Sequence, residues 1–323
     1  MSYAAIHVEP LQIPTYIQPG KEELPLFAEH RVHQRSTGRP YPNKAALEVR
    51  RDIREEVTYN AVHMENDYLD IWLLPEIGGR IFAAADKSTG YDFFYRQHVI
   101  KPGLIGALGS WISGGVEFNW PYHHSPSGFM PFDFETEECT DGSVICWMSE
   151  HDPVDRMKGM VGIVLRPDAA YLETRVKLCN RTPVTKSFLW WENAAGPVNE
   201  QYQIFFPKDV TYVNFHYLDS RVSYPMAGDT TYNGIDMKTA RDISWHKNTR
   251  DATSYFACAS KFDFFGGYDH GKRCGVVHIA DHHISPRKEN VHMGIQPVVQ
   301  ELGKHVDRYR WSIRGTDGRL LHR

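Results

Sequence analysis

Apolar and polar residues alternate with a period of two along much of the chain after residue 56. Clear examples are residues 57–63 (VTYNAVH), 68–74 (YLDIWLL) and 171–178 (YLETRVKL). Because successive side chains of a β-strand point to opposite faces, this period predicts strands with one buried face. Helical periodicity is nearly absent, and only residues 44–56 are expected to form a short helix.

Turn-forming segments separate these runs at intervals of about ten residues. Residues 75–79 (PEIGG), 141–142 (DG) and 180–183 (NRTP) combine glycine, proline and polar residues. A strand, a glycine turn and a second strand form the hairpin pattern of antiparallel sheets. The sequence therefore predicts an all-β, mainly antiparallel fold, either a sandwich or a barrel.

Composition divides the chain into three segments. Residues 1–45 are rich in proline and polar groups, which predicts an N-terminal arm with few hydrogen-bonded strands of its own. Residues 46–286 carry the alternation and predict the β domain. Residues 287–323 lack alternation and are crowded with Arg, Lys and His. We expect a poorly ordered tail there, and C-terminal strands that are missing from the fold.

Charge and cysteine usage exclude several classes of partner. The net charge is −4 and the basic residues are scattered, so nucleic acid is not an expected partner. No stretch approaches the length of a membrane span, and the N-terminus lacks the pattern of a signal peptide. The five cysteines form no CxxC pair, which favours reduced core thiols and a cytoplasmic location.

Residues 114–126 (GGVEFNWPYHHSP) mix chemical groups that neither a core strand nor a turn requires. A carboxylate and imidazoles supply acid–base groups near neutral pH, and Asn119 and Trp120 supply hydrogen bonds and a flat face. We interpret this run as the floor of a binding site, with Glu117, His123 and His124 as candidate catalytic residues. The alternative is a solvated or capping Glu117 and one structural imidazole.

Further candidates lie outside this run. Glu192 is a fourth candidate catalytic residue, because Glu117 and Glu192 could form the carboxylate pair of a glycosidase. Trp190 and Trp191 must point to opposite faces of a strand, so one of them belongs to the core. Arg80 has an alternative partner in Glu76. The candidate sugar-binding residues offer either a ring face or a directional hydrogen bond: Arg80, Trp111, Asn119, Trp120, Trp191, Asn193 and His283.

A second imidazole pair, His282-His283, stands shortly before Pro286. It could line the same cleft, although a turn before the proline explains it equally well. With His278 the pair suggests a metal, but no ligand spacing of a known zinc type is present. We therefore expect no metal and no cofactor.

Several segments carry a resemblance to known domains. Residues 75–81 (PEIGGRI) resemble the P-x-x-G-G-R-I hairpin of galactose-mutarotase-like domains, and residues 114–121 resemble their substrate-cleft loop. Residues 188–195 (FLWWENAA) resemble a strand of their central meander. Residues 20–286 as a whole, including 281–286 (DHHISP), resemble the domain DUF5107, which often precedes tetratricopeptide (TPR) repeats. The resemblance implies a β-supersandwich that binds carbohydrate.

The resemblance also identifies two departures. Mutarotase-like enzymes typically use a histidine on the central meander and a glutamate on a C-terminal strand. Here the meander position reads WWEN, without a histidine, and the chain encodes no matching C-terminal glutamate. Simple aldose epimerase activity is therefore not expected.

The tail after Pro286 departs most from the DUF5107 pattern. Read one nucleotide out of frame, Met293-Gly294 yields a tryptophan and the codon of Trp311 yields a glycine, as that pattern requires. We therefore hypothesise a frameshifted reading frame, so that the native protein continues past residue 323. The alternative is a divergent polar tail.

Three hypotheses about function follow. The first is a carbohydrate-active enzyme, epimerase-like or glycosidase-like, that acts on a mono- or oligosaccharide through Glu117 and a histidine. The second is a non-catalytic sugar-binding module of a larger TPR protein. The third is an inactive, frameshifted fragment.

Overall fold

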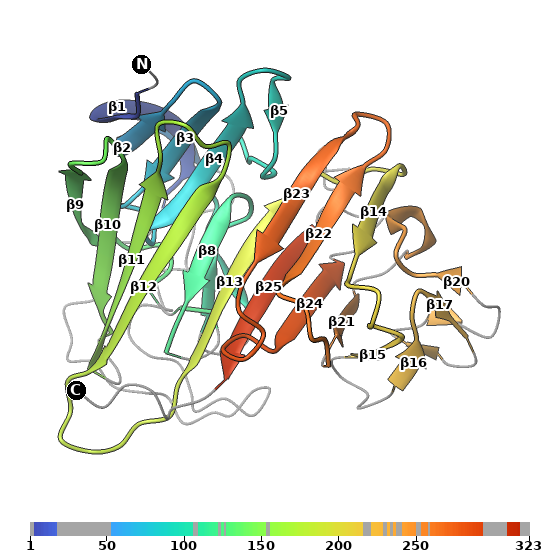
Figure 1. Cartoon of the computed structure of the whole chain (residues 1–323). Coiled ribbons are helices and arrows are strands. Elements are labelled where there is room, and N and C mark those ends of the chain that lie inside the picture. Colours follow the sequence, from blue (N-terminus) through green and yellow to red (C-terminus); the bar gives the residue numbers. More distant parts are fainter. Residues whose placement is uncertain are drawn as a thin grey trace. The chain divides into compact units, whose positions relative to one another are not determined.

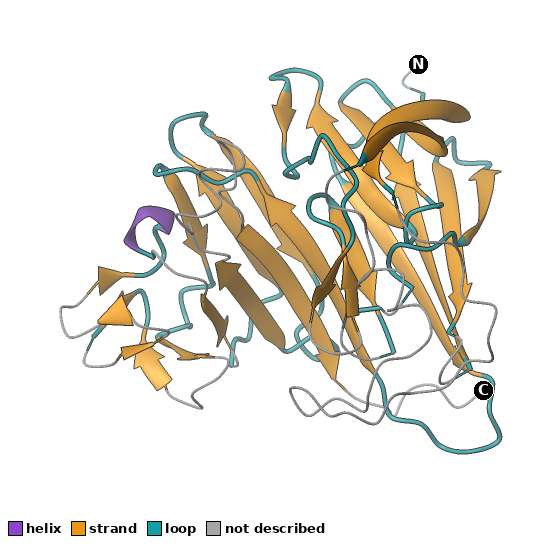
Figure 2. Cartoon of the chain, turned by 180° about the vertical axis from the view of Figure 1, so that it is seen from behind, coloured by secondary structure: helices purple, strands orange, loops and turns teal. Residues whose placement is uncertain are grey.

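The described chain consists almost entirely of β-strands joined by loops, as Figure 1 and Figure 2 show. This computed structural model describes residues 3–17, 53–105, 109–121, 124–125, 127–152, 156–215, 221–228, 231–232, 235–236, 241–249, 253–257, 259–292 and 309–316. The chain forms two compact units. Unit 1 comprises Met1–Asp92, Arg96–Trp190 and Asp317–Arg323, and unit 2 comprises Phe93–Tyr95 and Trp191–Thr316. Long strand pairs such as β1–β2, β10–β11 and β22–β23 are antiparallel, which confirms the predicted fold class.

Unit 1 contains two main sheets. The first has the strand order β1-β2-β3-β4-β8, with β5 on β4, and the second has the order β12-β11-β10-β9. Strands β6 and β7 form a separate two-stranded ribbon. The strands are β1 (Ala5–Tyr16), β2 (Arg54–Glu65), β3 (Leu69–Leu74), β4 (Arg80–Asp86), β5 (Tyr91–Asp92), β6 (Gly103–Ile105), β7 (Gly109–Trp111), β8 (Val116–Asn119), β9 (Asp133–Glu138), β10 (Val144–His151), β11 (Met157–Leu165) and β12 (Leu172–Asn180).

Strand β1 corrects the expectation of an arm with few strands. It pairs with β2 over its whole length, from Ala5–Glu65 to Tyr16–Arg54. The two prolines of β1 do not break this pairing. The carbonyl of Pro14 accepts a hydrogen bond from Ile100 N at 2.9 Å, so Pro14 directs its backbone groups away from β2. Pro10, four residues earlier, faces the same way, and neither proline is required to donate to the ladder.

The start of β2 overlaps the end of the short helix that we expected over residues 44–56. That expectation is wrong at Arg54–Glu56, where β2 begins, and residues 44–52 lie outside the described residues. No helix in the described part of the chain is long and apolar enough to span a membrane.

The turn between β3 and β4 requires glycine. Gly78 has φ +70° and donates from its backbone N to Met130 O at 2.8 Å. A Cβ atom at Gly78 would lie 2.1 Å from Gly128 O, so any side chain would collide with backbone. The turn therefore packs directly against the 128–130 loop. One core cluster of unit 1 lies beside it: Ile13, Tyr59, Ala61, Leu74, Ile77, Ile100, Ile112 and Phe129.

Unit 2 is built from shorter strands around an aromatic core. Strands β14, β22 and β23 form one sheet, and the strands β25, β24, β21, β15 and β16 are hydrogen-bonded neighbours in that order. β13 begins with Leu189 and Trp190, which end the Arg96–Trp190 segment of unit 1, and continues into unit 2. The elements are β13 (Leu189–Gly196), β14 (Tyr202–Phe205), β15 (Tyr212–Phe215), β16 (Arg221–Ser223), β17 (Met226–Ala227), β18 (Thr231–Tyr232), β19 (Ile235–Asp236), β20 (Arg241–Asp242), the 3-10 turn η1 (His246–Asn248), β21 (Thr253–Ala257), β22 (Phe264–Asp269), β23 (Cys274–Ile279), β24 (Arg287–His292) and β25 (Tyr309–Thr316).

The last two strands lie in the segment for which we expected missing strands. β24 pairs with both β21 and β25, in a register that runs from Arg287–Arg314 to His292–Tyr309. A backbone ladder does not require alternating side chains, which is why the sequence pattern did not reveal these strands. The expectation of a strandless tail is therefore wrong at these residues. Residues 293–308 and 317–323 lie outside the described part, and the frameshift stays a prediction.

Candidate functional site

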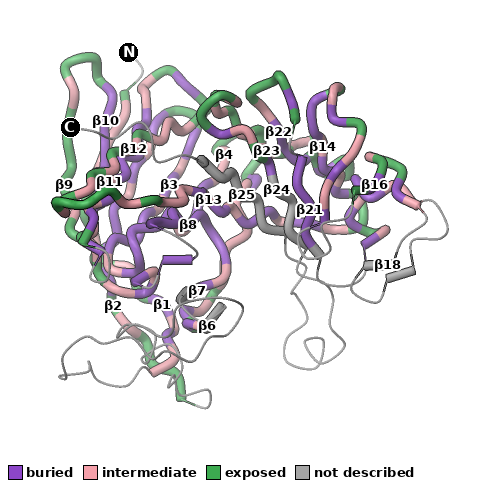
Figure 3. Tube along the Cα trace, turned by 90° about the horizontal axis from the view of Figure 1, so that it is seen from below, coloured by how far each residue is buried: buried purple, intermediate pink, exposed green. Residues whose placement is uncertain are grey.

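Strand β8 carries the first group of candidate site residues. All four of its residues are buried, as the tube in Figure 3 shows. Glu117 and Asn119 share one face of the strand, because side chains alternate. Gly115, just before β8, has φ +66°, and a Cβ atom there would lie 2.0 Å from Ile81 O. Glycine thus allows β8 to approach β4 closely and fixes the position of Glu117.

Arg80 supports the loop that leads into β8. It is 3% exposed, and its Nη2 donates to Ile112 O at 2.9 Å and to Gly114 O at 2.6 Å. Burial lowers the pKa of the Arg80 guanidinium, while the neighbouring Glu117 raises it. The alternative pairing with Glu76 is wrong, because Glu76 accepts from the backbone and side chain of Asn60. Arg80 therefore anchors the 112–114 backbone beside Glu117.

Glu117 and His124 form a buried acid–imidazole pair. Nδ1 of His124 lies 2.8 Å from Oε1 of Glu117, and the two side chains are 8% and 11% exposed respectively. A carboxylate at Nδ1 orients an imidazole and stabilises its protonated form, which suits proton transfer at Nε2. The structure thus brings together two of the predicted catalytic residues. His123 lies outside the described residues.

Asn119 and Trp120 continue this site. Asn119 Oδ1 accepts from Ser125 N at 2.9 Å, which ties β8 to the loop that carries His124. Asn119 Nδ2 and Trp120 Nε1 are buried donors without an acceptor within the described chain. Trp120 is 5% exposed, and its ring packs edge-on against Phe188, with the centroids 6.1 Å apart. The predicted role of Trp120 as an open stacking face is therefore wrong, because protein atoms cover the ring.

A second acidic group in unit 1 was missed by the sequence analysis. Ser127 Oγ donates to Glu150 Oε1, at the end of β10, and Asp152 is buried two residues further on. Burial, followed by the charge of Asp152, raises the pKa of Glu150 to about 8. A carboxyl group that is protonated near neutral pH is a candidate general acid. The available signal was the polar run SEHD directly after the apolar strand residues 144–148.

The remaining candidates lie on β7 and in unit 2. Glu192 Oε2 lies 3.3 Å from His278 Nε2, a partner that the sequence did not suggest. Trp191 and Asn193 are buried, with 6% and 4% exposure, so Trp191 is a core residue and its stacking role is wrong. Trp111 ends β7 and is partly exposed. Because Glu117 belongs to unit 1 and Glu192 to unit 2, the glycosidase pair stays a prediction.

The cysteines correct another expectation. Cys139, Cys146, Cys179 and Cys274 are free thiols, but of these only Cys146 is buried, and Cys179 is exposed on β12. Burial raises the pKa of the Cys146 thiol to about 12. Among the four described cysteines, Cys146 alone fits the prediction of a core thiol.

Comparisons with solved structures support the fold. A TPR-domain containing protein from Parabacteroides distasonis matches 99% of this chain with a TM-score of 0.77 and 19% identity, and the chain spans 52% of that protein. The protein Slr1438 from Synechocystis sp. PCC 6803 matches 79% of this chain and 85% of its own with a TM-score of 0.55 and 10% identity.

A candidate aldose 1-epimerase from Escherichia coli K12 matches 76% of this chain and 84% of its own, with a TM-score of 0.49 and 10% identity. That last likeness is too weak to carry an inference, and the other two show the fold alone. The family comparison goes further, because the model of DUF5107, a domain of unknown function, matches residues 39–296. The chain therefore belongs to the DUF5107 family.

Proposed function

We propose that this protein binds a mono- or oligosaccharide at β8 and the adjoining loop of unit 1, and that Glu117 and His124 perform acid–base chemistry on the sugar. The observation that carries this proposal is the 2.8 Å contact between His124 Nδ1 and Glu117 Oε1. With Nδ1 held by the carboxylate, Nε2 is the atom that takes or donates a proton. A hydroxyl proton of the sugar is the natural partner of such a base.

Neighbouring groups support a sugar rather than an apolar ligand. The buried amide donor of Asn119 would hydrogen bond to a sugar oxygen, which acts as an acceptor. Glu150, with its pKa raised to about 8, supplies a second proton donor within unit 1. The arrangement thus combines a base, an acid and directional donors, as the chemistry of a polyhydroxylated substrate requires.

Calorimetry and polarimetry together test this proposal. The intact chain is titrated with a panel of mono- and oligosaccharides, and the interconversion of anomers of any sugar that binds is followed by optical rotation. We expect the Glu117→Gln variant to keep sugar binding and to lose about 10²-fold or more in rate, as is typical when one acid–base group is removed. Hydrolysis of glycosidic bonds is followed in parallel.

The matched control is Glu192→Gln, which removes a carboxylate from the other glutamate–histidine pair. It is expected to leave the rate unchanged if Glu117 and His124 act on their own. An equal loss in both variants would instead support the glycosidase pair of Glu117 and Glu192. Absence of heat with every sugar of the panel would contradict the proposal.

A non-catalytic sugar-binding module is the second candidate. It is favoured by the burial of both members of the pair, since the side chains of His124 and Glu117 are only 8% and 11% exposed. In this case Glu117→Gln weakens binding, and no sugar is turned over. A role beside TPR repeats in a longer protein and a cytoplasmic location are further parts of the proposal.

A further inference from the structure

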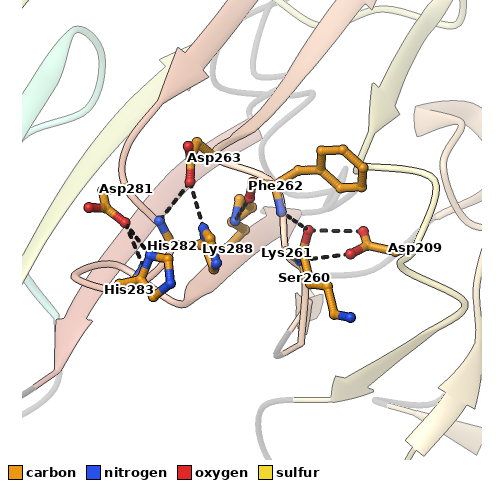
Figure 4. A network of polar contacts seen from close by, with 9 residues as sticks. All are labelled: Asp209, Ser260, Lys261, Phe262, Asp263, Asp281, His282, His283 and Lys288. Carbon is orange, nitrogen blue, oxygen red and sulfur yellow. Dashed lines mark hydrogen bonds and ion pairs between the residues drawn. The ribbon is translucent and has the colours of Figure 1, made fainter.

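The turn that follows β23 places two histidines beside two aspartates, as Figure 4 shows. Asp281 Oδ1 accepts hydrogen bonds from the backbone N of His283 at 2.8 Å and from its Nδ1 at 2.9 Å. Asp263, the residue directly before β22, binds His282 in the same way, at 2.9 Å and 2.7 Å. The two imidazole rings lie close together, with their centroids 3.9 Å apart. All four residues belong to unit 2.

This double contact determines which imidazole atoms face outward. An ionised carboxylate only accepts hydrogen bonds, so Nδ1 of each histidine is the donor. For His282, whose Nδ1 donates to Asp263, the lone pair of the neutral imidazole is then on Nε2. At His283 a metal ion would take the place of the proton shared by Nδ1 and Asp281 Oδ1, so that both of these atoms become ligands. A histidine whose Nδ1–H is held by a carboxylate and whose Nε2 is free is the usual state of a metal-ligating histidine.

We propose that Asp281, His282 and His283 bind a divalent transition-metal ion of the zinc type. Each of the three residues offers one ligand atom, and these atoms lie within 4.8 Å of one another. Two ligand atoms of a tetrahedral zinc site are about 3.4 Å apart, given bond lengths of about 2.1 Å. His283, whose side chain is 78% exposed, can rotate to close that difference.

The choice of metal follows from the ligands. Imidazole nitrogens select zinc, copper, nickel or cobalt over the hard cations Mg²⁺ and Ca²⁺, which prefer sites made of oxygen atoms. Two imidazoles and one carboxylate leave a fourth position of a tetrahedral ion for water. The three ligands are consecutive in the sequence, which is not a known zinc spacing, and Asp263 reaches His282 only through the fold.

The ligands lie on a well-supported base. Lys288, which is 1% exposed, donates from Nζ to Phe262 O at 3.0 Å, directly beside Asp263. On the other side of Phe262, Asp209 accepts from Ser260 Oγ at 2.9 Å and from Lys261 N at 2.7 Å. Hydrogen bonds at Ser260, Lys261 and Phe262 thus fix the loop that leads to Asp263. Asp263 acts as a positioning residue for His282 rather than as a ligand.

Titration of the intact chain with ZnCl₂, followed by calorimetry, tests the site. We expect saturable binding of Zn²⁺ and no heat with MgCl₂ under the same conditions. Removal of an exposed ligand by His283→Ala is expected to weaken Zn²⁺ binding at least tenfold. Asp263→Asn, which keeps the side-chain shape but removes the carboxylate, is expected to weaken it by about 10- to 100-fold. With Co²⁺ as the probe, the visible absorption of the bound ion should disappear in His283→Ala.

The matched control is His270→Ala. His270 also lies on a turn of unit 2, but its Nε2 contacts the amide of Gln203 at 2.9 Å instead of a carboxylate. This variant should bind Zn²⁺ like the wild type. Equal affinity of wild type and His283→Ala, absence of Zn²⁺ binding, or equal binding of Mg²⁺ would each overturn the proposal.

Discussion

Glu150 shows how burial changes the chemistry of a single residue. Its carboxyl group accepts from Ser127, and it lies near the buried Asp152. Burial is the main cause and the negative charge of Asp152 the second, and together they raise the pKa of Glu150 to about 8. Arg80 likewise donates hydrogen bonds to two backbone carbonyls, so its role is to hold the backbone in place.

The raised pKa of Glu150 predicts a pH-dependent stability. Between its ordinary pKa of 4.5 and about 8 the folded state holds more protons than the unfolded state. Its contribution to the free energy of unfolding therefore falls as the pH rises, by at most about 1.4 kcal/mol per pH unit. Glu150→Gln cannot titrate, so the variant should gain stability relative to wild type from pH 5 to pH 8. Urea unfolding at both values measures this change.

Glu135→Gln is the control, because Glu135 is an exposed residue of β9. It should follow the wild-type pH profile. An unchanged difference between Glu150→Gln and wild type over this pH range would show that Glu150 ionises normally in the folded protein.

At the scale of elements, close approaches of backbone decide where the strands and loops lie. The β3–β4 turn contacts the 128–130 loop through Gly78, and Gly115 brings β8 against β4. The edge strand β1 tolerates two prolines, because their missing donors face away from β2. The effect of each glycine or proline thus depends on which neighbouring backbone it contacts, and not on its own conformational preference alone.

The β3–β4 turn yields a prediction that separates backbone strain from steric collision. Gly78 and Gly90 have nearly equal φ values, +70° and +68°, but a Cβ atom at Gly90 would meet nothing within 4 Å. Gly90→Ala should therefore lose about 1 kcal/mol from the left-handed conformation alone. Gly78→Ala should lose about 1–3 kcal/mol more, because its Cβ collides with Gly128. Chemical denaturation of both variants measures the difference, and equal losses would contradict the collision.

At the scale of the molecule, the chain is a DUF5107 domain of two β units. The family match ends at residue 296, shortly after the point at which we place the change of reading frame. β24 and β25 nevertheless pair in the described part of this tail. Backbone pairing does not depend on which side chains the reading frame encodes. The pairing of β24 with β25 therefore neither supports nor contradicts the frameshift hypothesis.

Resequencing of the gene around codon 287 tests the frameshift. We expect one inserted or deleted nucleotide near the codon of Pro286, followed by a downstream frame that reads on past residue 323. An unambiguous in-frame sequence there would show that the tail is a divergent segment of the native protein.

The sequence alone determined the local features of this protein. Residues 57–63 and 68–74 alternate and form β2 and β3, and the glycine turn at 75–79 joins β3 to β4, because period and turn chemistry are properties of neighbouring residues. The candidate pair of Glu117 and His124 was within reach of sequence reasoning for the same reason, since both lie in one short polar run.

Only the tertiary structure decided which distant polar groups meet. Ser127 reaches Glu150 across 23 residues, Asp263 reaches His282 across 19, and Arg80 reaches the carbonyl of Gly114 across 34. The tertiary structure also decided that Trp120 and Trp191 are buried. From the sequence, an indole ring at either position was equally compatible with the core and with a ligand-binding surface. Such contacts depend on strand pairing and on the packing of loops against sheets, and no local pattern in the chain encodes them.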